Sequence, residues 1–169
     1  IILKSEKDRT QIWKDGVWQE KSESFLSVLR ETQKNYKAPK LSGIPHFTGG
    51  LVGFMGYESI TWVEDIPIYV KDELQCPDAL FMLFHEMIAF DHLQNQVILF
   101  SNVQIEEGLD LELAYHDANS RIDQMGEDLH TDIDYQTPAR LEQSDLQSNF
   151  TQSEFENAVC KTKEHIKAG

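Results

Sequence analysis

The chain has 169 residues, of which 40% are apolar and 10% aromatic, enough for one folded domain with an attached helix. Its formal net charge of −14 argues against nucleic acid and anionic membrane as partners, since both require a basic surface. No apolar run reaches membrane-spanning length, no secretory signal pattern opens the chain, and the two cysteines, Cys76 and Cys160, are far apart, so we expect a reduced, cytoplasmic protein.

The first 36 residues predict short strands followed by a helix. Two apolar runs, at residues 1–3 and 11–13, precede an Asp-Gly pair between apolar flanks, which is typical of a hairpin turn. Ser22 or Ser24 can then cap a helix that extends to about Tyr36, because apolar side chains recur along one face.

The most distinctive segment is the glycine-rich stretch that follows. Four of the nine glycines fall within residues 49–56 and are interleaved with large apolar side chains. This pattern predicts a tightly packed strand whose backbone approaches a neighbour closely, and we expect a central, buried strand of an antiparallel sheet. Glycines can also cradle phosphate, but residues 49–53 lack the spacing of a dinucleotide fingerprint and no Lys-Ser/Thr pair follows them.

The middle of the chain predicts a long β-hairpin. Residues 62–78 have the composition of a loop, and residues 81–91 and 96–103 form two apolar runs around a polar turn at 92–95. Both runs are apolar on both faces, which indicates a sheet that is covered on both sides. The predicted class is therefore α+β, with antiparallel sheets, a long hairpin and flanking helices.

The last third predicts two helices and a connector. Residues 109–125 have helical spacing, residues 127–149 are polar without a period, and Thr151 with Glu154 forms a capping box for a helix at about 153–167. The apolar stripe of this last helix needs a partner surface. We expect it to pair with another copy of the chain, in preference to packing on its own domain or fraying.

No catalytic, cofactor-binding or metal-binding residue can be assigned from the residues themselves. The six histidines are scattered, and the nearest cluster, His85-Glu86 with Asp91-His92, is interpreted as polar positions of the hairpin because it offers no closed ligand set. Neither cysteine lies in a nucleophile signature, and no Gly-x-Ser-x-Gly motif occurs.

Three segments resemble one enzyme family. Residues 45–58, Pro-His-Phe-Thr-Gly-Gly-Leu-Val-Gly-Phe-Met-Gly-Tyr-Glu, resemble the segment P-x-F-x-G-G-x-V-G-Y-x-x-Y-D of anthranilate synthase component I, with Phe54 and Glu58 as mild departures. Residues 77–92 look like the family's long strand and its Asp-His turn. Residues 150–169 look like the helix that leads into the family's catalytic domain, and the three segments occur in the family's order.

The resemblance implies a domain organisation. Residues 1–149 would be the non-catalytic, regulatory N-terminal domain, half of the family's layered α/β architecture, and residues 150–169 the helix that leads into the catalytic domain. We expect the chain to be trimmed at both ends. In the family the catalytic domain holds chorismate and Mg²⁺ and contributes to the tryptophan-feedback site, so no family site residue can be carried onto this chain.

The resemblance also implies a reaction for the parent enzyme. It would convert chorismate and ammonia to anthranilate and pyruvate in tryptophan biosynthesis, with ammonia supplied by a glutamine amidotransferase subunit, while this chain alone would be inactive. Aminodeoxychorismate synthase component I shares the same segments and is the alternative within the family, although Val52 and the Asp91-His92 turn favour anthranilate synthase. A free-standing binding or regulatory module without catalysis is the alternative from another class.

Overall fold

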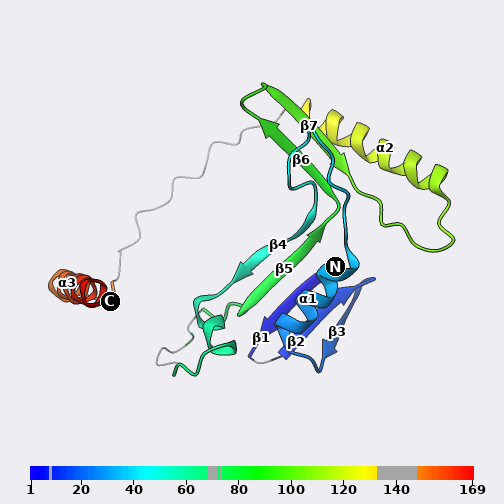
Figure 1. The fold of residues 1–169 in the computed structure, drawn as a ribbon. Helices are drawn as coiled ribbons and strands as arrows, with labels where there is room; N and C mark the ends of the chain where they lie inside the picture. Colours follow the sequence, from blue (N-terminus) through cyan, green and yellow to red (C-terminus); the bar gives the residue numbers. More distant parts are fainter. Residues whose placement is uncertain (8, 68–71, 73, 133–147) are drawn as a thin grey trace. The chain divides into compact units, whose positions relative to one another are not determined.

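The computed structural model describes residues 1–7, 9–67, 72, 74–132 and 148–169, and Figure 1 shows its elements. They form two compact units, Ile1–Thr131 and Asp132–Gly169. The first unit contains strands β1 to β7, helices α1 and α2 and the 3-10 helix η1 (Tyr57–Trp62), and the second contains helix α3 (Gln152–Ala168). The predicted α+β class with antiparallel sheets is confirmed.

Five strands form an antiparallel sheet in the order β3-β2-β1-β5-β4. They are β1 (Ile2–Glu6), β2 (Arg9–Lys14), β3 (Val17–Lys21), β4 (Gly50–Met55) and β5 (Ala79–Phe84). The predicted hairpin at Asp15-Gly16 joins β2 to β3, with Lys14 opposite Val17. Both turn residues have positive φ, 52° and 82°, as a two-residue turn between twisted strands requires.

Helix α1 (Phe25–Asn35) lies on one face of this sheet and closes the core of the first unit. Ser24 caps the helix, because its Oγ accepts a hydrogen bond from the Ser27 amide at 3.4 Å. The Phe25 ring packs 5.5 Å from the Trp62 ring and 6.1 Å from the Phe81 ring, centroid to centroid. The buried apolar side chains of this core are Leu3, Phe25, Val28 and Ala79.

The glycine-rich strand β4 is not the central, buried strand that the sequence predicted. It lies at the edge of the sheet, where β5 is its one partner among the described residues, and Val52 and Phe54 are each 46% exposed. The predicted close approach is real but involves a single neighbour: a Cβ added at Gly53 would lie 2.6 Å from Phe81 Cα. A glycine within a strand therefore predicts that a neighbouring backbone comes close, but it does not predict whether the strand has one paired neighbour or two.

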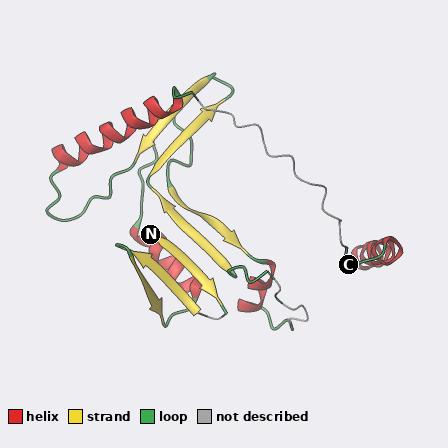
Figure 2. Cartoon of the chain, turned by 180° about the vertical axis from the view of Figure 1, so that it is seen from behind, coloured by secondary structure: helices red, strands yellow, loops and turns green. Residues whose placement is uncertain are grey.

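The long strand predicted at residues 81–91 is broken at His85. β5 belongs to the five-stranded sheet, whereas β6 (Glu86–Asp91) pairs with β7 (Gln96–Ser101) in a separate two-stranded sheet. Figure 2 shows these two groups of strands meeting at the break. The hairpin prediction is right for residues 86–101 and wrong for 81–84, which pair with β1 and β4 instead.

Helix α2 (Leu111–Leu129) covers one face of the β6–β7 hairpin. Its Arg121 joins the two elements, since Nε lies 2.9 Å from Glu86 Oε1 and donates to Ser101 Oγ at 3.1 Å. The helix ends at Leu129, beyond the predicted end at residue 125, so the first residues of the predicted connector are helical. Residues 133–147 of that connector lie outside the described residues, as do 68–71 and 73 of the predicted loop.

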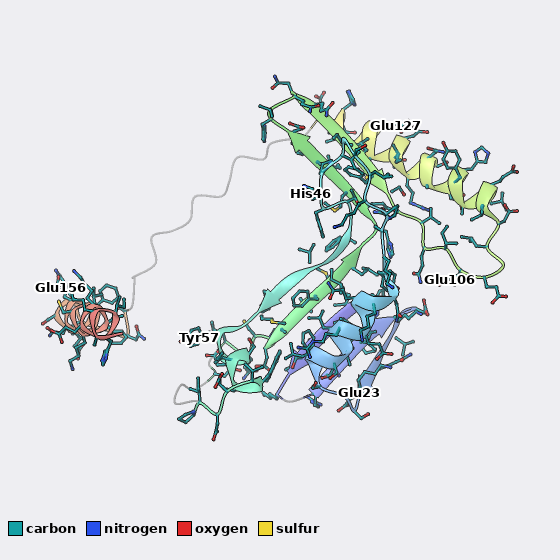
Figure 3. The ribbon with its side chains drawn as sticks, in the orientation of Figure 1. Glu23, His46, Tyr57, Glu106, Glu127 and Glu156 are labelled. Carbon is teal, nitrogen blue, oxygen red and sulfur yellow. The ribbon has the colours of Figure 1, made fainter. Side chains whose placement is uncertain are left out.

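The negative charge is spread over exposed parts of separate elements. Glu23, Glu106 and Glu127 are exposed and belong to the approach to α1, the β7–α2 loop and α2 (Figure 3). No helix in the described part of the chain combines the length and the apolar character that crossing a bilayer requires.

Helix α3 begins with the predicted capping box. The Thr151 amide and Oγ1 donate to Glu154 Oε2 at 2.8 Å and 2.7 Å, and the Glu154 amide donates to Thr151 Oγ1 at 3.3 Å. The residues of its apolar stripe are exposed: Phe155, Val159 and Ile166. Pairing of this helix with another copy of the chain stays a prediction.

We expect the start of α3 to loosen as the pH falls. The hydrogen bonds from Thr151 lower the pKa of the Glu154 carboxyl, so their stabilisation is present at neutral pH and is lost as the pH drops below about 4. The protection of the amides in the first turn of α3, measured as the intrinsic exchange rate divided by the observed rate at the same pH, should therefore fall in acid. The Glu154→Gln variant keeps a capping side chain that does not titrate, and an equal acid response in this variant would contradict the assignment.

Candidate functional site

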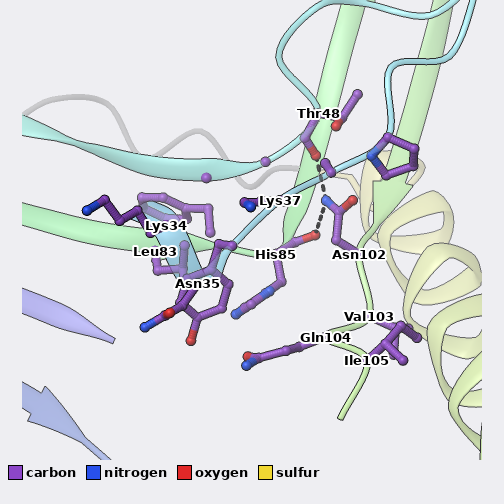
Figure 4. Close-up of a pocket in the computed structure, with 16 residues that line it drawn as sticks. Lys34, Asn35, Lys37, Thr48, Leu83, His85, Asn102, Val103, Gln104 and Ile105 are labelled. Carbon is purple, nitrogen blue, oxygen red and sulfur yellow. Dashed lines mark hydrogen bonds between the residues drawn. The ribbon is translucent and has the colours of Figure 1, made fainter. Parts of the chain in front are cut away.

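A cavity of about 410 Å³ opens where three parts of the first unit meet. These parts are the C-terminal end of α1, the glycines that lead into β4, and the break between β5 and β6 with the segment after β7 (Figure 4). The polar and charged side chains that line the cavity are Lys34, Asn35, Tyr36, Lys37, Thr48, His85, Asn102 and Gln104.

Asn102 holds the three parts together. Its Nδ2 donates to the Thr48 carbonyl at 2.7 Å and to the His85 carbonyl at 2.9 Å, and its backbone amide also donates to His85 at 2.8 Å (Figure 4). The half-buried side-chain amide of Asn102 thus bonds to the carbonyls of Thr48 and His85, which are 54 and 17 residues away in the sequence. The chain changes partners at this point: β5 pairs with β1 and β4, whereas His85 bonds to Asn102 in register with the pairing of β6 and β7.

Gly49 gives Asn102 the room that it needs. A Cβ at position 49 would lie 2.6 Å from Asn102 Nδ2, and the backbone there has a φ of 156°. Gly50 has a φ of 134°, which side-chain-bearing residues rarely adopt. The first two glycines of the distinctive segment therefore serve this junction, while Gly53 serves the pairing of β4 with β5.

The rim of the cavity is cationic and aromatic. The Tyr36 and His85 rings meet edge to face, 6.0 Å apart, and Lys34 and Lys37 are exposed beside them. None of the described residues that line the cavity is an aspartate or glutamate. The site offers hydrogen-bond donors and positive charge, which suit an anionic group.

The cluster that the sequence analysis considered does not assemble. His85 lines the cavity, and Glu86 pairs with Arg121 of α2 instead. Asp91 lies at the hairpin turn, where its Oδ1 accepts from the Leu93 and Gln94 amides at 2.9 Å, as a polar hairpin position should. Within the described part of the chain, no three His, Cys, Asp or Glu side chains come close enough to hold a metal ion.

Sequence reasoning missed the residue that organises this junction. Asn102 follows an apolar strand directly, and a polar side chain at such a position is a weak signal that only the fold turns into a contact. Cys76 and Cys160 are exposed and free, and neither is among the residues that line the cavity.

Comparison with known proteins identifies the family. Residues 2–169 match the family model described as chorismate binding enzyme. The chain belongs to this family. Anthranilate synthase component 1 of Pseudomonas aeruginosa is 29% identical over 99% of this chain and 35% of its own length. The protein of the same name from Pseudomonas putida is 31% identical over 87% of this chain and 30% of its own length.

A solved structure supports the fold of this family member. The crystal structure of anthranilate synthase component I from Streptococcus pneumoniae TIGR4 has a TM-score of 0.59 and 24% identity, and covers 100% of this chain and 38% of that protein. The resemblance to anthranilate synthase component I seen in the sequence is thus confirmed. The chain spans about a third of the length of these relatives.

Proposed function

We propose that this chain is the non-catalytic N-terminal part of anthranilate synthase component I. The complete enzyme would convert chorismate and ammonia to anthranilate and pyruvate in tryptophan biosynthesis. The observation that carries this proposal is that relatives with that name match almost the whole chain but extend to nearly three times the matched length. Residues 1–149 would form the regulatory domain, and residues 150–169 the helix that leads into the catalytic domain.

The side chains of this chain fit a supporting role better than a catalytic one. Mg²⁺, which the resemblance implies for the complete enzyme, prefers carboxylate and other oxygen ligands in close groups, and the described residues bring no such group of side chains together. The cavity at Asn102 has cationic and amide groups but no acidic residue among its described lining. We therefore assign Mg²⁺ and chorismate to the remainder of the enzyme, and derive no catalytic step from this chain.

We also propose the partners of the complete enzyme. Ammonia would come from a glutamine amidotransferase subunit in the cytoplasm, as the resemblance implies for the family. Relatives that are named component 1 support a multi-component enzyme, since the name implies at least one further component.

The proposal predicts that the chain alone does not turn over chorismate. Incubation with chorismate, ammonium and Mg²⁺ should give no anthranilate fluorescence above a control without protein. The complete polypeptide that carries this chain should give anthranilate under the same conditions. Turnover by the chain alone would refute the non-catalytic assignment, and 4-amino-4-deoxychorismate from the complete polypeptide would favour the alternative enzyme of the same family.

A further inference from the structure

The cavity at Asn102, which we call the cationic cavity, is built from segments that contain no acidic residue. The chain has 29 aspartates and glutamates, yet none occurs from residue 32 to residue 57 or from residue 92 to residue 105. The lining of the cavity comes from these two stretches and from residues 83–85. The fold thus brings segments without carboxylates together around one cavity, which favours entry of an anion into a chain whose net charge is −14.

The two lysines of the cationic cavity are not paired with a carboxylate. Neither Lys34 nor Lys37 belongs to an ion pair between described residues. Two carboxylates directly follow lining residues in the sequence: Glu86 is bound by Arg121 at 2.9 Å, and Glu106 is exposed on the β7–α2 loop. A cation in the last turn of α1 also offsets the helix dipole, but that effect is confined to the last turn and accounts for Lys34 alone.

The hydrogen-bond donors of the cationic cavity come from three parts of the fold. The lysines belong to the end of α1, His85 lies at the break between β5 and β6, and Gln104 follows β7. In Figure 4 the side chains of His85 and Gln104 both extend toward the end of α1. A carboxylate presents two oxygens in one plane, whereas a phosphate group presents three oxygens in different directions and up to two charges. Donors from three directions and two lysines therefore suit a phosphate group better.

A second cavity in the first unit does not share this character. It has a volume of about 430 Å³ and lies between residues 43–45 and the β6–β7 hairpin, where Ala89 and Ile98 belong to the face opposite α2. Its described lining includes Asp91 and His92 but no lysine. The cationic lining is therefore specific to the first cavity, and is not a general property of the hollows in this unit.

We propose that the cationic cavity binds the phosphate group of a small phosphate monoester. The two lysines offset the charge of the phosphate, and the His85 ring and the Gln104 amide donate hydrogen bonds to its oxygens. The half-buried side chains of Leu83 and Val103 provide an apolar wall for the organic part of the ligand. A volume of about 410 Å³ suits a ligand of this size. Cationic side chains hold the phosphate here, and not a glycine fingerprint, which the sequence lacks.

Titration with three small anions tests this proposal. Inorganic phosphate, phenyl phosphate and benzoate are added to the chain at constant ionic strength, and the amide signals are followed by NMR. With phenyl phosphate, the signals of residues 48–50, 85 and 102–104 should shift and saturate. Phenyl phosphate should bind at least about threefold more tightly than inorganic phosphate, because its ring buries apolar surface against the wall of the cavity. It should also bind more tightly than benzoate, which has the same ring but a single charge.

Two double variants of equal charge separate the cavity from the overall charge. Lys34→Gln with Lys37→Gln should weaken the binding of phenyl phosphate by about tenfold or more, because two charge-assisted contacts are lost. Lys161→Gln with Lys163→Gln removes the same charge from α3 and should leave the binding as in the parent chain. All four lysines are exposed, so both variants should keep the urea midpoint of the parent chain.

Four results would overturn the proposal. Shifts that do not saturate would mean that no site exists. Equal weakening by the two double variants would mean that the overall charge governs binding. Inorganic phosphate that binds as tightly as phenyl phosphate would mean that the ligand is free phosphate, and equally tight benzoate would mean that it is a carboxylate. None of these measurements uses chorismate, so this proposal stands or falls independently of the reaction proposed for the complete enzyme.

Discussion

The Gly53→Val substitution should destabilise the first unit by about 1–3 kcal/mol or more. A Cβ at this position would lie 2.6 Å from Phe81 Cα and 2.8 Å from the Leu80 carbonyl carbon, and both atoms belong to the backbone of β5. Backbone atoms of a paired strand cannot rotate away as a side chain can. The strand β4 must therefore separate from β5 or shift its register, and either change disrupts an edge of the five-stranded sheet.

Gly126 provides the matched control for this prediction. It lies within α2, and an added Cβ would meet Leu99 Cδ1 at 3.8 Å, an ordinary contact. Gly126→Ala should thus be neutral or stabilise the unit by up to about 1 kcal/mol, because alanine favours the helix. The measurement is the midpoint of urea unfolding for both variants. A Gly53→Val midpoint equal to that of the parent chain would show that β4 does not pair closely with β5 in solution.

The elements that the sequence predicted well depend on signals close together in the chain. The Asp15-Gly16 pair specified the hairpin between β2 and β3, and Ser24 marked the start of α1 within a few residues. Thr151 and Glu154 form a capping box whose partners are three residues apart. In each case the atoms that interact belong to one turn of the chain, so no knowledge of the fold is needed.

The predictions that failed depend on partners far away in the sequence. The position of β4 in the sheet depends on its pairing with β5, which follows it by more than twenty residues. Nothing within β4 itself shows on which side it has a partner. At His85 the chain changes from the partners of β5, which are β1 and β4, to β7, and Asn102 at this junction bonds to Thr48, 54 residues away. The run from residue 81 to 91 carries the polar pair His85-Glu86 at the break, but such a pair suits both a single strand and two shorter ones.

The same reason explains why the candidate site was not found. Its polar groups come from α1, from the glycines before β4 and from the residues on either side of the β6–β7 hairpin. A strand that is apolar on both faces did suggest two neighbours for the sheet, and the β6–β7 hairpin has them.

Asn102→Ala should destabilise the first unit by about 1–3 kcal/mol, because the Thr48 carbonyl loses this donor and the His85 carbonyl keeps only the bond from the backbone amide of residue 102. This loss should not vary with pH relative to the parent chain, since alanine does not titrate. The junction of the two sheets should loosen first, so amide exchange near His85 and Asn102 should quicken more than in the core of α1. Unfolding in urea at several pH values measures the first effect, and hydrogen exchange followed by NMR measures the second.

Asn102→Asp separates the role of the donor from the role of the side-chain shape. A carboxylate there would face the Thr48 and His85 carbonyl oxygens at about the distances of 2.7 Å and 2.9 Å that the amide nitrogen has now. Such contacts disfavour the charged form, so the pKa of the introduced carboxyl should be higher in the folded state than in the unfolded state. A raised carboxyl pKa means that the folded state binds more protons, and stability relative to the parent chain should fall as the pH rises from about 4 towards neutrality. In acid the protonated group can donate one hydrogen bond, so the Asn102→Asp variant should be at least as stable as Asn102→Ala there, and less stable than it at pH 7. Parallel pH profiles for the Asp and Ala variants would show that the side chain at this position does not face the two carbonyls.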